Sequence, residues 1–125
     1  MEYQFDLRSR SYAFNVKVIK KFRKYYEQRF YRSMIDQLIR SAGSVGANLT
    51  ESKHSDTIRE YVRYYDIALR SGNETLYWMN LLKDTLEEET DEISTLIVEL
   101  KEILKVLAQS VKTLRKNRDA KKLKI

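Results

Sequence analysis

The sequence predicts an all-α protein, an up-down-up-down four-helix bundle. The chain of 125 residues contains no proline and only three glycines. This leaves too few turn residues for a β-sandwich, a barrel or an alternating β–α fold. Apolar residues recur every three or four positions in four long segments, which is the period of amphipathic helices. Short polar stretches separate these segments, and short connections make successive helices antiparallel neighbours.

The first helix is expected over residues 9–26. Its apolar stripe consists of Tyr12, Val16, Ile19, Phe22 and Tyr26. We expect this stripe to face the core, and the basic residues between its members to lie largely on the outer face.

The second helix is expected over residues 30–52. Its stripe consists of Phe30, Met34, Leu38, Ala42, Val45 and Leu49. Gly43 and Gly46 lie in its middle, although a glycine costs a helix up to about 1 kcal/mol relative to alanine. We interpret both glycines as positions where another backbone approaches closely. A break near Gly46 is the alternative to a continuous or kinked helix, which we favour.

The third helix is expected over residues 57–86, because Thr57 followed by Glu60 forms a capping-box pattern. Its stripe covers about eight turns. The members are Ile58, Tyr61, Tyr65, Ala68, Gly72, Thr75, Met79, Leu82 and Leu86.

The fourth helix is expected to begin at Thr90, which we interpret as its N-cap. Its stripe has near-heptad spacing. The members are Ile93, Leu96, Leu100, Ile103, Leu107, Val111 and Leu114. A basic segment follows this stripe. We therefore predict one bundle domain over residues 1–116 and a basic, disordered tail over residues 117–125.

Charge is distributed unevenly along the chain. Residues 112–125 carry a net charge of +6, which equals that of the whole chain. Residues 17–32 hold seven basic side chains and one acid, whereas residues 87–92 hold five acids and no base. The acids suit the positive end of the fourth helix dipole. The basic segments indicate an electrostatic partner, with a solvated helix face and a solubilising tail as the alternative.

Nucleic acid is the partner that the basic segments favour. Lysine and arginine neutralise phosphates without reading sequence, and interleaved tyrosines can stack on unpaired bases. The candidate contact residues are Lys17, Lys20, Lys21, Lys24, Arg63, Arg70, Lys112, Arg115 and Lys116.

Aromatic residues indicate self-association. The chain has nine tyrosines, and Tyr64, Tyr77 and Trp78 lie off the main stripe of the third helix. Tyrosine and tryptophan are favoured at interfaces because one end is apolar and the other can hydrogen-bond. The alternative is that these rings only widen the core.

Composition gives little support for catalysis. The absence of cysteine excludes disulfides, thiolate metal sites and cysteine nucleophiles. The single histidine, His54, lies in a polar connection and is expected to be a surface residue. Glu51, Asp66 and Glu74 could form a carboxylate site, but di-metal bundles use Glu-x-x-His pairs, which this chain lacks. We expect no enzyme activity, no catalytic or metal-binding residue and no cofactor.

The sequence also bears on location. No segment has the apolar core of a signal peptide or the length of a membrane-spanning helix. We therefore expect a cytoplasmic protein without a membrane partner.

Two stretches of the sequence resemble a known family. Residues 37–52 read QLIRSAGSVGANLTES, and residues 60–74 read EYVRYYDIALRSGNE. In order and spacing they resemble the signature of the bacterial "four helix bundle protein" family, also called 23S rRNA intervening-sequence proteins. The chain departs from this signature at Gly46, where the family has proline, and at Ser52 and Arg70, where it has glycine.

The resemblance implies a four-helix bundle assembled as a ring-like homopentamer. It also implies kinship with the accessory variability determinant of diversity-generating retroelements, a basic pentameric barrel that binds nucleic acid and a reverse transcriptase. We assign structural or interface roles, rather than ligand binding, to the motif residues Gln37, Arg40, Asn48, Glu51, Ser71 and Glu74.

Together these features predict a non-enzymatic, homopentameric accessory protein that contacts the backbone of RNA or DNA through basic residues. The alternative is a protein-interaction adaptor. Such an adaptor would dock a partner enzyme, such as a reverse transcriptase, without contacting nucleic acid itself.

Overall fold

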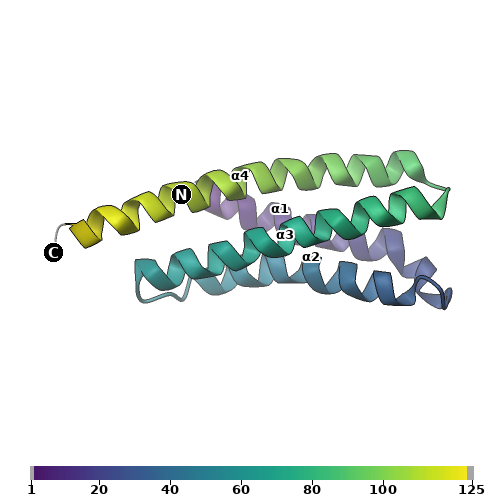
Figure 1. Ribbon diagram of the computed structural model, residues 1–125, viewed down its shortest axis with the longest axis horizontal. Helices are drawn as coiled ribbons and strands as arrows, with labels where there is room; N and C mark the ends of the chain where they lie inside the picture. The colour runs from purple at the N-terminus through teal and green to yellow at the C-terminus, as the bar shows by residue number, and fades with distance from the viewer. Residues whose placement is uncertain (1, 124–125) are drawn as a thin grey trace.

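Four α-helices run in alternating directions along one bundle (Figure 1). The computed structural model describes the backbone of residues 2–123 and the side chains of residues 7–120. The elements are α1 (Glu2–Phe22), the 3₁₀ helix η1 (Arg23–Glu27), α2 (Arg32–Ser52), α3 (Ile58–Leu86) and α4 (Thr90–Leu123). The described residues form only helices and turns, which confirms the predicted all-α four-helix fold.

Most helix boundaries follow the sequence signals. Thr57 caps α3, because its hydroxyl accepts a hydrogen bond of 3.1 Å from the backbone N–H of Glu60. Helix α2 continues through Gly43 and Gly46 without a break. Helix α4 begins at Thr90, as expected, but its first backbone bond runs from Ile93 N–H to the carbonyl of Glu89 at 3.0 Å. The residue at the N-cap is therefore Glu89, rather than Thr90.

Both ends of the chain are more helical than predicted. Helix α1 starts at Glu2, and Leu7 extends its buried face beyond the expected start at residue 9. Helix α4 continues to Leu123, so residues 117–123 are helical where we expected a disordered tail. No proline or glycine interrupts this segment, and its lysines and arginines suit the negative end of the helix dipole. The last turns of α4 extend past the α2–α3 turn (Figure 1). Residues 124–125 lie outside the described range.

The predicted core stripe of α1 is wrong. The buried side chains of α1 and η1 are Leu7, Phe14, Val18, Phe22 and Tyr25. Of the predicted stripe only Phe22 is buried, whereas Tyr12, Val16, Ile19 and Tyr26 are exposed. The helix carries two apolar stripes, and spacing alone does not tell which one the other helices cover.

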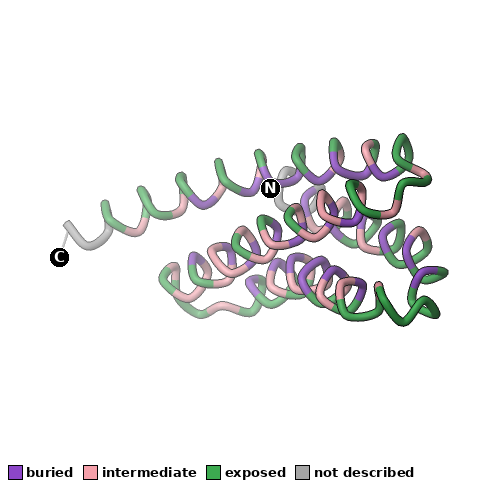
Figure 2. Tube along the Cα trace, turned by 45° about the vertical axis from the view of Figure 1, so that its right-hand side comes forward, coloured by how far each residue is buried: buried purple, intermediate pink, exposed green. Residues whose placement is uncertain are grey.

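The stripes of the other three helices largely face the core, as predicted. Figure 2 shows buried residues where the helices face one another, and mostly exposed residues in the last turns of α4. The exception at the start of α2 is Phe30, which is 82% exposed because it lies in the turn before that helix. No helix among the described residues combines the length and apolar content needed to cross a membrane.

One glycine of α3 lies directly against a core side chain of α4. A Cβ built on Gly72 would lie 2.3 Å from Cδ2 of Leu104, so the absence of a side chain in α3 admits a core residue of α4. Gly43 and Gly46 are different, because a Cβ there would meet Asn15 Nδ2 at 3.7 Å and Ser11 Cβ at 3.9 Å. These are ordinary contacts, so the interpretation of these two glycines as close-approach sites is wrong within one chain.

A charge ladder joins α1 and η1 to α4. We use this name for four ion pairs whose members are widely separated in the sequence and follow one another along the two antiparallel helices. The pairs are Arg10–Glu102 at 3.0 Å, Lys17–Glu99 at 2.8 Å, Lys21–Glu92 and Lys24–Glu89. Each exposed pair contributes at most about 1 kcal/mol. Their common effect is to fix how α1 lies against α4.

Gly46→Ala and Gly72→Ala test this packing as a matched pair. Replacing a helical glycine by alanine gains about 0.5–1 kcal/mol of stability. At Gly72 the added methyl group would collide with Leu104, and overpacking of a core costs about 1–3 kcal/mol. We expect Gly72→Ala to be less stable than Gly46→Ala by about 1–3 kcal/mol in urea unfolding. Equal unfolding free energies would contradict the proposed role of Gly72.

The variant Glu89→Gln tests the charge ladder through the pH dependence of stability. Hydrogen bonds from Lys24 and then from Tyr25 lower the pKa of Glu89 from 4.5 to about 2. Such a carboxylate stabilises the fold fully above its unfolded pKa, and this contribution is lost as the pH falls from about 4.5 towards 2. We expect the wild type to lose more stability than Glu89→Gln between about pH 5 and pH 2, measured by urea unfolding followed by circular dichroism. Asp84→Asn, outside the ladder, should behave as wild type, and parallel profiles for Glu89→Gln and wild type would argue against the ladder.

Candidate nucleic-acid interface

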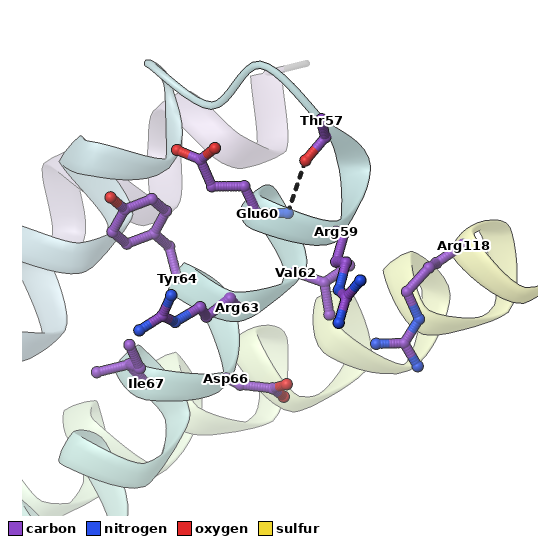
Figure 3. Close-up of a pocket in the computed structure, with 9 residues that line it drawn as sticks. All are labelled: Thr57, Arg59, Glu60, Val62, Arg63, Tyr64, Asp66, Ile67 and Arg118. Carbon is purple, nitrogen blue, oxygen red and sulfur yellow. Dashed lines mark hydrogen bonds between the residues drawn. The ribbon is translucent and has the colours of Figure 1, made fainter.

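A basic groove lies between the start of α3 and the end of α4 (Figure 3). Its volume is about 570 Å³. We call it the α3–α4 groove, and its lining residues are Thr57, Arg59, Glu60, Val62, Arg63, Tyr64, Asp66, Ile67 and Arg118. The two helices meet here because α4 continues helical beyond the region that we predicted to be ordered.

Three arginines line this groove from two helices. Arg59 and Arg63 are four residues apart and therefore share a face of α3. Figure 3 shows the guanidinium groups of Arg59 and Arg118 directed into the same space from opposite helices. Among the described side chains, Arg59 and Arg63 form no ion pair, whereas Arg118 pairs only with the adjacent Asp119 at 3.2 Å.

Asp66 lowers the net positive charge of the groove and connects its two helices. Asp66 accepts a hydrogen bond of 2.6 Å from Arg115, which ties α3 to α4. Glu60 is the other acid in the lining, so arginines still outnumber acids. Guanidinium groups are planar forks that match phosphate oxygens in pairs, and they hold their charge at any physiological pH. The groove therefore suits a phosphate-bearing ligand.

The four lysines predicted from α1 and η1 lie elsewhere, and three of them are paired with acids. Lys17, Lys21 and Lys24 belong to the charge ladder, and Lys21 also lies 3.6 Å from Glu89. Lys20 lines the same surface, a second groove of about 550 Å³ that also includes Glu92 and Glu99. The structure thus brings these four predicted residues together, but among acids that offset their charge.

The other predicted contact residues lie on α3 and α4. Arg63 lines the α3–α4 groove and Arg115 lies at its wall. Arg70, Lys112 and Lys116 are exposed and do not line it.

Arg59 and Arg118 are not among the contact residues predicted from the sequence. The spacing of Arg59 and Arg63 was a usable signal, because residues four apart share a helix face. Nothing in the sequence placed Arg118 beside them, since that requires the alignment of α3 and α4.

The family-motif residues form polar contacts between α2 and α3. Arg40 donates to Gln37 at 2.9 Å and to Glu74, and the indole N–H of Trp78 donates to Glu74 at 3.0 Å. Only the Arg40–Glu74 contact joins the two helices across their seam, whereas the other two lie within α2 and within α3.

A second polar group lies on the same seam. The hydroxyl groups of Ser44 and Ser71 are 2.8 Å apart, and the amide of Asn48 donates to the carbonyl of Ser44 at 2.8 Å. Glu51 is exposed, and no side-chain hydrogen bond of Glu51 is found among the described residues. The six motif residues therefore do not converge on one site.

The residues weighed for catalysis are also dispersed. His54 is exposed in the α2–α3 turn. Asp66 pairs with Arg115, and Glu74 pairs with Arg40. Within residues 7–120, no group of three or more His, Asp and Glu side chains is placed to hold a metal ion.

Comparison with known proteins places the chain in a family. The model of the family described as "23S rRNA-intervening sequence protein" matches residues 4–109. No curated protein matches the sequence at significant similarity. Among solved structures, a protein of unknown function from the S23 ribosomal protein family of Bacteroides thetaiotaomicron superposes with a TM-score of 0.81 at 25% identity. The match covers 88% of this chain and 98% of that one. The chain therefore belongs to the family of 23S rRNA-intervening sequence proteins.

Proposed function

We propose that this protein is a non-enzymatic, homo-oligomeric nucleic-acid-binding protein that contacts the sugar–phosphate backbone through the α3–α4 groove. One observation carries the proposal. Arg59, Arg63 and Arg118 line a single groove from two helices, and Arg59 and Arg63 have no acidic partner among the described residues.

The charge of the whole molecule supports this site. Residues 112–125 account for a net charge of +6, and most of this segment belongs to the half of α4 that forms the groove and extends beyond it. At the other end of the bundle, the ladder offsets the lysines of α1 and η1 with acids of α4 and of the turn before it. A polyanion is therefore attracted to the groove end.

The chemistry of the groove favours backbone contact over base reading. Arginines and lysines bind phosphates through charge and displace counterions, which makes binding strong at low salt and weak at high salt. Lys112 and Lys116, exposed on the same half of α4, extend the positive surface for a longer strand.

The exposed stripe of α1 supports self-association. Of the seven large apolar side chains exposed in the described chain, three lie on α1 itself. Tyr12, which is 74% exposed, lies on one face of α1 with Val16 and Ile19. A continuous apolar face of this kind on a helix usually marks an interface. The ring-like homopentamer implied by the family resemblance is the assembly that we propose for it.

The double variant Arg59→Gln/Arg63→Gln tests the groove. Each lost phosphate contact should reduce the slope of log affinity against log salt by about 1. We expect affinity for labelled RNA, DNA and hybrid duplexes to fall at least about tenfold, with a slope smaller by about 2, in fluorescence anisotropy across a salt series.

Lys101→Gln/Lys105→Gln is the matched control for this variant. It removes the same charge from exposed positions of α4 outside the groove, and should retain most of the affinity. Equal affinities of the two double variants would show that the α3–α4 groove is not the nucleic-acid-binding site. If the wild type binds no probe at low salt, the adaptor function replaces nucleic-acid binding as the better proposal.

Val16→Glu/Ile19→Glu tests the interface on α1. Charges placed on an apolar interface prevent its burial, so we expect monomers of 15.0 kDa in place of a larger wild-type assembly in sedimentation velocity. Val98→Glu, at an exposed apolar position of α4, is the control and should keep the wild-type mass. A monomeric wild type at micromolar concentration would rule out the oligomer.

A further inference from the structure

A second cluster of arginines and aromatic rings lies at the end of the bundle opposite the α3–α4 groove. It occupies residues 23–32, which comprise η1 and the connection to α2, and we call it the aromatic turn. Its exposed members are Arg23, Tyr26, Arg29, Phe30 and Arg32. Phe30 is 82% exposed, more than any other large apolar side chain in the described residues.

Hydrogen bonds connect the aromatic turn to the bundle, and Phe30 lies outside the core. The hydroxyl of Tyr31 donates to the carbonyl of Thr85 at 3.0 Å, and the hydroxyl of Tyr25 donates to Glu89. The N–H of Gln28 bonds the carbonyl of Tyr25 at 3.0 Å, and the N–H of Tyr31 bonds that of Gln28 at 2.9 Å. The core beneath is already filled by Tyr25 and its buried neighbours.

Each of the two exposed rings has one packing partner. Phe30 packs edge-to-face on Tyr31, with ring centroids 5.4 Å apart. Arg32 lies over the ring of Tyr26 at 5.3 Å and donates to its backbone carbonyl at 3.1 Å. Phe30 and Tyr26 are thus held in place before any ligand arrives, which reduces the entropy cost of binding.

Charges around these rings favour an anionic ligand. Arg23 and Arg29 are exposed and form no ion pair among the described side chains. The facing acids are Glu27 in the turn and Asp36 on α2, and Lys24 is paired with Glu89. With Arg32, the turn has three arginines against the two acids Glu27 and Asp36, an excess of one positive charge.

We propose that the aromatic turn binds an unpaired segment of nucleic acid, with bases stacked on Phe30 and Tyr26 and the flanking phosphates on Arg23 and Arg29. Aromatic side chains bind bases only where the base faces are uncovered, which excludes the interior of a duplex. This inference rests on the proposed nucleic-acid binding and adds a preference for single strands. The groove lining reaches Ile67 of α3, and the turn contacts the same helix at Thr85. These positions are 85 − 67 = 18 residues apart, which corresponds to roughly 27 Å along the helix, so the turn and the α3–α4 groove are distinct.

Phe30→Ala tests the proposal, with single-stranded RNA, single-stranded DNA and a blunt duplex of the same sequence as anisotropy probes. Loss of one stacked base should weaken single-strand binding by roughly 5- to 150-fold and leave duplex binding unchanged. The two single-stranded probes show whether ribose matters. Phe30→Trp should retain the affinity, because it keeps a stacking surface.

Tyr77→Ala is the matched control, because Tyr77 is another exposed aromatic residue, on α3 outside the turn. It should bind as wild type. Sedimentation velocity on each variant shows whether a change in affinity comes from a change in oligomeric state. If Phe30→Ala alters the oligomer and leaves single-strand affinity unchanged, the turn is an interface between proteins and the proposal is wrong.

The outcomes also separate this inference from the proposed function. If Phe30→Ala binds single strands as tightly as the wild type while Arg59→Gln/Arg63→Gln binds nucleic acid more weakly, the proposal for the aromatic turn is wrong and the proposal for the α3–α4 groove stands. If Phe30→Ala binds single strands more weakly while Arg59→Gln/Arg63→Gln binds as the wild type does, the proposal for the aromatic turn stands and the proposal for the α3–α4 groove is wrong. If the wild type binds none of the probes, both proposals are wrong.

Discussion

The carboxylate of Glu89 joins three elements at one end of the bundle. It pairs with Lys24 and accepts a hydrogen bond from Tyr25 of η1, and Lys21 of α1 lies 3.6 Å away. The carbonyl of Glu89 starts the hydrogen-bond series of α4. Glu89 has a φ of 55°, in the left-handed region, which costs a non-glycine residue roughly 1–2 kcal/mol. These contacts offset that cost and hold the α3–α4 turn where α1 can pack against it.

The charge ladder that begins at Glu89 gives the two ends of the molecule different electrostatic character. The basic segment of α1 and the acidic segment at the start of α4 are far apart in the sequence and adjacent in the fold, so they largely offset one another. The basic residues at the end of α4 meet only Asp66 and Asp119 as ion-pair partners among the described residues. Positive charge is therefore concentrated around the α3–α4 groove.

The family motif and the proposed contact residues serve different purposes. Arg40 donates to Glu74 across the α2–α3 seam and to Gln37 within α2, and Ser71 contacts Ser44 across the same seam. Residues used in this way specify how two helices pack. The motif therefore identifies the fold, and any binding activity must be argued from the arginines of the groove.

The amino-acid sequence by itself determined the four helices, the cap at Thr57 and the core faces of α2, α3 and α4, because periodicity and capping are local properties. It also determined the family, through the motif over residues 37–74. Tertiary structure alone decided which of the two apolar stripes of α1 is buried, since both have helical spacing and only the neighbouring helices distinguish them. It likewise decided that Lys17 and Lys24 face acids while Arg59 meets Arg118 across a groove. Contacts between residues so far apart depend on how the helices align, and helical periodicity does not encode that alignment.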